Sequence, residues 1–230
     1  MRIVKALLKQ LLKPSRRYPK RIGEYLIAAN ELGQYCIPRL AAHRPACQAI
    51  LSGEVWEAET IRFLCDHADG AIIHGGTFFG DFLPALGRAC DQVWAFEPNP
   101  DSFKCAEITI RLNDLRNVTV MNVAMGRGDG TATLITECDG KYLGGGSYIV
   151  EGHGSTQIRA IDAVIPRYCK IGAIHLDVER SEGPALDGAR QTIEKWKPII
   201  VLETVPPNNF LAELGYRQRR LINGNRVFTI

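Results

Sequence analysis

Carboxylates follow three apolar segments of the chain, and their positions are the first indication of chemistry. They are Glu97 after VWAF, Asp177 and Glu179 after AIHL, and Glu203 after PIIVL. A carboxylate just past a buried strand is costly unless it binds something. Glu97 can accept two hydrogen bonds from a ribose diol, and Asp177 and Glu179 are candidate catalytic bases for an acceptor that must lose a proton. The spacing of Asp177, Glu179 and Glu203 does not require a metal ion, so no metal is predicted.

A glycine-rich turn, AIIHGGTFFGDF, lies upstream of Glu97. Gly75, Gly76 and Gly80 separate an apolar run from a helical pattern, where glycine lets the backbone approach a ligand. A dinucleotide-binding pattern would require glycine at the position of Thr77, which disfavours a nicotinamide-dependent oxidoreductase. An adenosine-containing ligand without a pyrophosphate fits both the turn and Glu97, and S-adenosylmethionine is the obvious candidate.

Further candidate cofactor residues lie at the opening of the turn and beyond the second and third predicted strands. An adenine ring would lie at the end of the third strand, and the histidine that opens the turn is a candidate hydrogen-bonding partner. These additional residues are His74, Pro98, Asn99, Asn122, Val123 and Ala124.

A glycine-rich segment at residues 139–155 is long enough to act as a lid. His153 lies between glycines in EGHGS and is a third candidate catalytic base if this segment closes over the site. His175, in contrast, alternates with the buried residues of its strand and is expected to be structural.

Short apolar runs alternate with helical patterns from residue 71 onward, which is typical of a parallel sheet covered by helices on both faces. Strands are predicted at 71–75, 92–97, 118–123, 172–177 and 198–204, and helices at 57–68, 81–90, 100–113, 161–168 and 184–196. TATLIT and TQIRAI predict two further strands, and GYRQRRLINGNRVFTI predicts a hairpin that turns at Asn223 and Gly224. The predicted fold class is α/β, with a doubly wound, mostly parallel seven-stranded sheet that ends in an antiparallel hairpin.

Residues 1–50 are predicted to form a basic helical N-terminal extension, followed by one domain at 51–230. Residues 1–21 carry eight basic and no acidic side chains, and residues 1–13 have the pattern of a short amphipathic helix that Pro14 ends. This helix would either dock on the body or, with the rest of residues 1–21, contact an anionic surface. Nucleic-acid binding is not expected, because the basic stretch lacks interleaved aromatic residues. A second helix is predicted at 22–33.

Composition and cysteine usage fit one ordinary soluble domain. The net charge is +3, and 46% of the residues are apolar. The seven cysteines are odd in number and contain no closely spaced pair, which argues against a zinc knuckle and favours a reduced, cytoplasmic protein. Lysines interrupt MRIVKALLKQLLK too often for a signal peptide.

Seven blocks in order resemble the FkbM-family methyltransferases over about residues 53–204. They are GEVWEAETIRFL, AIIHGGTFFGDF, VWAFEPNP, NVAMGRGDGTATL, TQIRAIDAVIP, IGAIHLDVERSEGPALDGA and KPIIVLE. The resemblance implies a Rossmann-like class I methyltransferase fold, S-adenosylmethionine as the cofactor, and O-methylation of a hydroxyl on a sugar, lipid or secondary metabolite. It places Gly76 and Gly80 beside the methionine part of the cofactor, Glu97 at the ribose, and Asp177 and Glu179 facing the transferring methyl group.

Two positions depart from the pattern of this family. His74 stands where the family usually has an acid, and Arg180 stands where the family's DVEG has glycine. Glycine permits a left-handed backbone and leaves room, so Arg180 would either crowd the acceptor pocket or bind an anionic acceptor. These departures leave open a non-catalytic alternative, a module that binds S-adenosylmethionine and acts through partners. The sequence predicts no particular oligomeric state.

Overall fold

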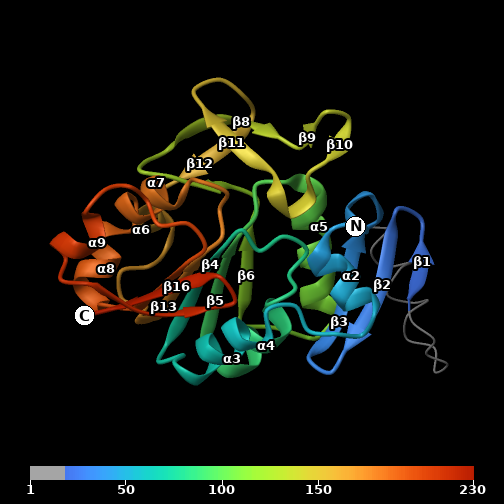
Figure 1. Ribbon diagram of the computed structural model, residues 1–230, viewed down its shortest axis with the longest axis horizontal. Helices are drawn as coiled ribbons and strands as arrows, with labels where there is room; N and C mark the ends of the chain where they lie inside the picture. The colour runs from blue at the N-terminus through green and yellow to red at the C-terminus, as the bar shows by residue number, and fades with distance from the viewer. Residues whose placement is uncertain (1–18) are drawn as a thin grey trace.

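The computed structural model describes residues 19–230, which build a central seven-stranded sheet (Figure 1). The strand order is β15-β16-β14-β13-β4-β5-β6. The strands are β4 (Ala71–Gly75), β5 (Gln92–Phe96), β6 (Val118–Met121), β13 (Ile171–Leu176), β14 (Ile199–Leu202), β15 (Arg217–Ile222) and β16 (Asn225–Thr229). β16 pairs antiparallel with both β14 and β15, and the other pairs of this sheet are parallel. The predicted doubly wound sheet with its C-terminal hairpin is therefore confirmed.

Helices cover both faces of this sheet, because successive strand residues point to opposite sides. Ile72 and Ala173 pack with α3 (Ala58–Asp66), α4 (Leu83–Ala89) and α5 (Pro100–Leu112). Ile73 and Ile174 instead pack in the cluster formed by α6 (Ile161–Val164), α7 (Glu182–Asp187), α8 (Arg190–Trp196) and α9 (Phe210–Glu213). Among the helices of the described chain, none combines the length and hydrophobicity that crossing a bilayer requires.

Two of the predicted helices differ from the observed ones by more than their end residues. The helix predicted at 161–168 ends after Val164, because Ile165 precedes Pro166 and adopts the extended backbone that proline imposes on its predecessor. The helix predicted at 184–196 is divided into α7 and α8 at Gly188. A Cβ atom at Gly188 would lie 2.0 Å from the carbonyl oxygen of Gly126, so the chain at Gly188 passes too close to the backbone of Gly126 for a larger residue.

The prediction of a helix at 22–33 is wrong. This segment instead belongs to a three-stranded antiparallel sheet, whose strands are β1 (Lys20–Ile22), β2 (Tyr25–Asn30) and β3 (Gly33–Pro38). Strand β3 packs on α5, where Cys36 N donates to Thr109 Oγ1 at 3.0 Å. This tertiary packing outweighs the local helical pattern. The 3-10 turn η1 (Arg39–Ala41) and α2 (Pro45–Leu51) follow, and the predicted boundary at residue 50 falls within α2. The predicted helix at 1–13 lies outside the described residues, as does most of the predicted anionic contact surface.

A smaller four-stranded sheet, yellow in Figure 1, lies above the central sheet in that view. Its strands are β7 (Ala124–Met125), β8 (Gly130–Ile135), β11 (Tyr148–Glu151) and β12 (Thr156–Arg159). The strands predicted for TATLIT and TQIRAI are confirmed as β8 and β12. The predicted lid is more ordered than expected, since it contains β10 (Lys141–Tyr142), η2 (Gly144–Gly146) and β11, while β9 (Glu137–Cys138) pairs with β10.

Candidate active site

The register of the central sheet brings the predicted carboxylates to one edge. Glu97, Asp177 and Glu203 each follow the last paired residue of their strand. The last paired residues of the neighbouring strands β6, β5, β4, β13 and β14 are aligned with one another. They are Met121, Phe96, Gly75, Leu176 and Leu202. Because parallel strands end at the same edge, residues far apart in the sequence meet there.

Two adjoining cavities open at this edge. The inner cavity, of about 460 Å³, is lined by Gly76, Ser181 and residues 96–98, 123–125, 144–145, 147–149 and 177–179. It therefore contains the predicted cofactor residues Glu97, Pro98, Val123, Ala124 and Asp177. Residues 144–149, from the predicted lid, already form one of its walls.

Glu97 is the buried polar centre of the inner cavity, with 7% of its surface exposed. Its Oε2 accepts a hydrogen bond from Phe78 N and its Oε1 accepts one from Asn99 N, both at 2.8 Å. Burial raises the pKa of Glu97 to about 8, against the opposing effect of these two bonds. Each oxygen keeps a lone pair for a further donor, so Glu97 fits the ribose diol of an adenosine ligand.

Gly76 forms the narrow point beside Asp177. Its φ is +76°, and a Cβ atom built on it would lie 1.7 Å from the carbonyl oxygen of Asp177. Only glycine allows this approach, which leaves the strand ends free to border a ligand. Gly75 and Gly80 line neither cavity of the described chain. Gly80 instead lies against Leu83 with a φ of +84° and turns the chain into α4.

The two asparagines predicted to bind the cofactor hold the backbone of the site. Asn99 caps α5, where its side chain accepts from Asp101 N at 3.0 Å. Asn122 Nδ2 donates to the carbonyl oxygens of Glu97 at 2.8 Å and Pro98 at 3.0 Å. Neither residue lines the inner cavity, but both contact Glu97, Asn99 through its backbone N–H and Asn122 through its side-chain amide.

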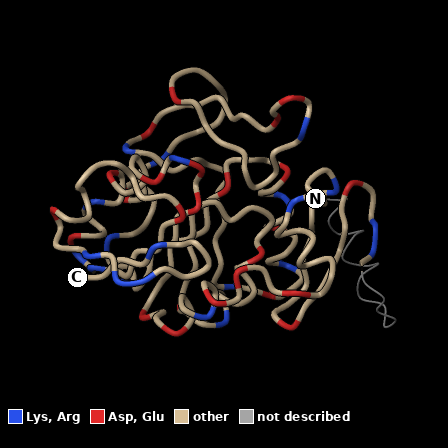
Figure 2. Tube along the Cα trace, in the orientation of Figure 1, with Lys and Arg blue, Asp and Glu red and all other residues tan. Residues whose placement is uncertain are grey.

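The second cavity, which we call the acidic cleft, has a volume of about 740 Å³ and is open to solvent. Gly76, Gly145, Asp177 and Glu179 also line the inner cavity and so form the wall between the two. The acidic cleft has five carboxyl groups in its lining, and Figure 2 shows several acidic positions near the centre of the molecule. They belong to Glu57, Asp81, Asp177, Glu179 and Glu203.

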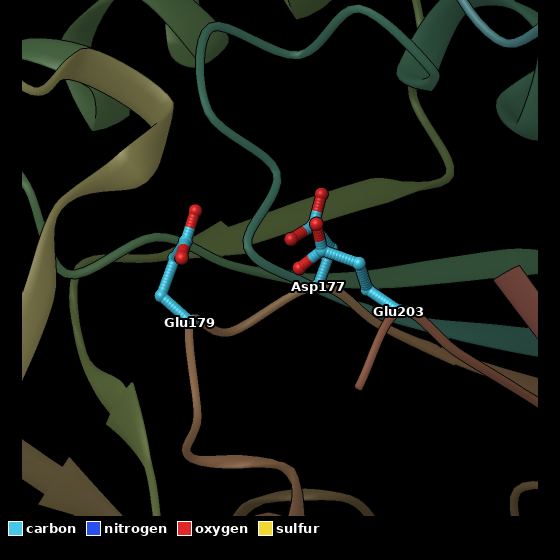
Figure 3. Close-up of side chains that lie close together, drawn as sticks. All are labelled: Asp177, Glu179 and Glu203. Carbon is cyan, nitrogen blue, oxygen red and sulfur yellow. The ribbon is translucent and has the colours of Figure 1, made fainter. Parts of the chain in front are cut away.

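Asp177, Glu179 and Glu203 gather on one side of the acidic cleft (Figure 3). One carboxylate oxygen from each lies within 4.8 Å of the others, which is close enough to hold a single cation. Figure 3 shows the carboxyl groups of Asp177 and Glu203 side by side. Burial, and then the adjoining Glu203, raise the pKa of Asp177 well above its usual value. Asp177, on the wall of the inner cavity, therefore holds a proton more readily than an exposed aspartate does.

His74 and His175 form an uncharged pair at the acidic cleft. They are register partners on β4 and β13, and their Nδ1 atoms lie 2.9 Å apart, so one of the two must donate. Burial lowers the pKa of His175 to about 4 and that of His74 well below its usual value. His74 does not line the inner cavity. The structure therefore places it with the structural His175 rather than beside the expected cofactor.

Two residues considered for the acceptor lie away from both cavities. His153 is exposed in the turn between β11 and β12, where its carbonyl oxygen accepts from Thr133 Oγ1. Arg180 is exposed, has a φ of +76°, and lines a separate groove with Arg127. The left-handed backbone explains why a glycine suits this position, and Arg180 does not crowd the acceptor side.

The sequence interpretation missed several residues of the acidic cleft. Arg44, Trp56 and Glu57 come from the segment before the central sheet, and Asp81 and Phe82 follow the glycine turn. Trp56 and Glu57 lie within the first of the resembling blocks, but nothing in their spacing marks them as site residues. The helix predicted at 81–90 would begin at Asp81. The observed helix α4 begins at Leu83, and Phe82 is its N-cap residue.

The buried Asp81 predicts a pH-dependent stability. Burial, together with the charge of Glu57, raises the pKa of Asp81 from 3.8 to about 7, so the folded state binds more protons than the unfolded state across this interval. The free energy of unfolding therefore falls as the pH rises through it. Over this pH interval, the free energy of unfolding of the wild type should fall by a few kcal/mol relative to that of Asp81→Asn, because each pKa unit corresponds to about 1.4 kcal/mol. Urea unfolding from pH about 4 to about 8 measures this difference. Asp139→Asn, at an exposed turn, controls for the loss of a carboxylate, and an equal pH dependence in both variants would contradict the prediction.

Comparisons with known proteins agree with this geometry. The family profile described as the methyltransferase FkbM domain matches residues 74–224. An FkbM methyltransferase from Methylobacillus flagellatus superposes with a TM-score of 0.50 at 18% identity, covering 70% of this chain and 43% of that chain. This chain thus spans less than half the length of that neighbour.

Two further solved structures superpose over most of the chain. M. jannaschii TYW2 in complex with AdoMet has a TM-score of 0.49 at 13% identity, covering 93% of this chain and 86% of that chain. A Pyrococcus abyssi tRNA (uracil-54, C5)-methyltransferase in complex with S-adenosyl-L-homocysteine has a TM-score of 0.49 at 12% identity, covering 93% of this chain and 48% of that chain. No curated protein sequence matches the chain. The profile match covers more than half of the residues, and it shows that the chain belongs to the FkbM family of S-adenosylmethionine-dependent methyltransferases.

Proposed function

We propose that the protein transfers a methyl group from S-adenosylmethionine to a hydroxyl oxygen of a small-molecule, glycan or lipid acceptor. The observation that carries this proposal is the position of Asp177, which lies on the wall shared by the inner cavity and the acidic cleft. The inner cavity fits the cofactor, because the free lone pairs of Glu97 can accept ribose hydroxyls beside apolar residues such as Val123 and Met125. The acidic cleft, on the other side of Asp177, fits the acceptor.

The residues of the chain supply orientation and a place for one proton. When bound, S-adenosylmethionine supplies a methyl group on a sulfonium sulfur, which keeps the electron pair of the broken bond and leaves as neutral S-adenosylhomocysteine. Asp177 is placed to accept the proton that the acceptor hydroxyl loses as its oxygen gains the methyl carbon. Burial and the neighbouring Glu203 raise the pKa of Asp177, which makes its ionised carboxylate a stronger base for this step. Glu97 fixes the ribose end of the cofactor.

Product release tests this proposal against the non-catalytic alternative. The purified protein is incubated with S-adenosylmethionine and a pool of hydroxylated sugars, lipids and secondary metabolites, and S-adenosylhomocysteine is measured by mass spectrometry. We expect acceptor-dependent release, with the added methyl group on an oxygen of the product. Tight binding of S-adenosylmethionine without release from any pool would instead support a module that acts through partners.

A further inference from the structure

The acidic cleft carries more negative charge than its surroundings compensate. Arg44 is the one basic side chain among its lining residues, against five carboxyl groups. Within residues 19–230, none of these five carboxylates belongs to an ion pair. Arg44 lowers the pKa of Glu179, whereas burial, the largest effect, raises it. Arg180, which lies outside this cleft, also lowers the pKa of Glu179, so both guanidinium groups act on the same one of the five acids.

The hydrogen bonds within the acidic cleft do not compensate most of the negative charge of its carboxylates. Glu57 Oε2 accepts from Asn225 Nδ2 at 2.7 Å, and Arg226 donates to the carbonyl oxygen of Glu203 rather than to its carboxylate. Asp177 and Glu203 face one another, where two like charges oppose ionisation. Carboxyl groups held together in this way are stabilised in their charged form by a cation.

The remaining walls of the acidic cleft are also suited to a cation. His74 and His175 are neutral, are each 2% exposed, and have Nε2 atoms without a hydrogen-bond partner in the described chain. They therefore bring no positive charge to the lining. The aromatic residues Trp56, Phe78 and Phe82 line the same cleft, and aromatic faces attract organic cations. An anionic group would meet repulsion here, because the lining has five carboxyl groups and Arg44 as its one guanidinium.

We propose that the acceptor carries a protonated amine, which lies among the carboxylates and aromatic residues of the acidic cleft while a separate hydroxyl group faces Asp177. This inference rests on the proposed function and adds the charge class of its substrate. Hydroxylated amines, such as amino sugars, amino alcohols and hydroxyaryl amines, have both groups. The organic ammonium is favoured over a bare metal ion, because three aromatic side chains share the lining with the carboxylates.

Matched probes that differ only in charge test this assignment at equilibrium. Three sets are used: glucosamine with N-acetylglucosamine and glucuronic acid, 6-aminohexanol with hexanol and 6-hydroxyhexanoate, and tyramine with N-acetyltyramine and 4-hydroxyphenylacetate. Binding to the full chain saturated with S-adenosylhomocysteine is measured by calorimetry and ligand-observed NMR. In at least one set, we expect the amine to bind about tenfold or more tightly than its neutral and acidic partners.

Variants show whether the selectivity arises in the acidic cleft. Glu57→Gln should weaken binding of the best amine about fivefold or more, on the order expected for the loss of one charged contact. Glu203→Gln serves the same purpose if Glu57→Gln does not fold. Glu151→Gln, at an exposed position of β11 outside both cavities, is the matched control and should leave amine binding unchanged.

The possible outcomes separate this inference from the proposed function. Tighter binding of neutral or acidic members, or no amine binding at millimolar concentration, would overturn the amine assignment even if methyl transfer is observed. Binding of Mg²⁺ alone that is lost in Glu203→Gln, with no preference among the probes, would make the acidic cleft a divalent-cation site instead. Amine selectivity without any methyl transfer would support the charge assignment and count against the proposed function only.

Discussion

Asp177→Asn is expected to lower methyl-transfer turnover about 100-fold or more, in line with the loss of a general base. Asparagine keeps the shape of the side chain and can donate a hydrogen bond to Glu203, but it cannot accept the hydroxyl proton. Asp177 borders both cavities, and burial beside Glu203 raises the pKa of its carboxyl, so its ionised form is a stronger base than an exposed aspartate. Turnover is measured as S-adenosylhomocysteine release with the best acceptor, and cofactor binding is measured separately by calorimetry.

His153→Ala provides the control for Asp177→Asn. His153 lies on an exposed turn outside both cavities, so its removal should leave turnover close to that of the wild type. Urea unfolding of Asp177→Asn checks that the fold is retained. Full activity in Asp177→Asn would move the base to Glu179, the other carboxylate on the shared wall, whereas a loss confined to His153→Ala would make His153 the base.

Glu97→Ala should weaken binding of S-adenosylmethionine by about 2 kcal/mol or more, which corresponds to a loss of about 30-fold in affinity. The substitution removes the acceptor for two ribose hydroxyls and also releases Phe78 N and Asn99 N, which its carboxylate oxygens hold at 2.8 Å. Calorimetry with S-adenosylhomocysteine measures the affinity without turnover. Glu137→Ala, at an exposed position of β9, is the control for the removal of a glutamate.

The same carboxylate predicts a pH dependence of cofactor affinity. Burial places the pKa of Glu97 at about 8, and hydrogen bonds from ribose hydroxyls favour the charged form. Affinity should therefore rise with pH until it levels off above about 8, and binding below that pH should release a proton. Glu97→Ala should lose this dependence. An unchanged affinity in Glu97→Ala, or the same pH profile in both proteins, would place the ribose elsewhere.

The raised pKa values of three carboxyl groups in the two cavities have a common physical origin. Glu97, Asp81 and Asp177 are acids that burial keeps from ionising freely, and none of them forms an ion pair within residues 19–230. Each favours a ligand that stabilises its charge, through donated hydroxyl hydrogen bonds at Glu97 and through positive charge in the acidic cleft. The stability measured with Asp81→Asn and the cofactor affinity measured with Glu97→Ala both report the free-energy cost of ionising a buried carboxyl group, at two places in the fold.

The sequence by itself determined the central sheet and the strand ends that carry Glu97 and Asp177. Strand periodicity, the glycine turn and the Asn223–Gly224 hairpin are local signals, because they depend on neighbouring residues and on backbone conformations that few residues adopt. The row of carboxylates could also be predicted, since parallel strands must end at a common edge. Seven blocks in order were enough to indicate the family, which the profile match over residues 74–224 confirms.

Only the tertiary structure decided the segment before the sheet and the composition of the acidic cleft. Residues 22–33 form strands because β3 is held against α5, at Thr109, by contacts that no local pattern shows. Glu57 and Asp81 meet Asp177 and Glu203 across long stretches of chain, and burial in the fold raises the pKa of Glu57, Asp81 and Asp177. Asn99, Asn122 and His153 have residue types suited to a site, but packing directs the first two to the backbone and leaves the third in solvent. A side chain's type depends on the sequence alone, whereas its neighbours and its solvent depend on the fold.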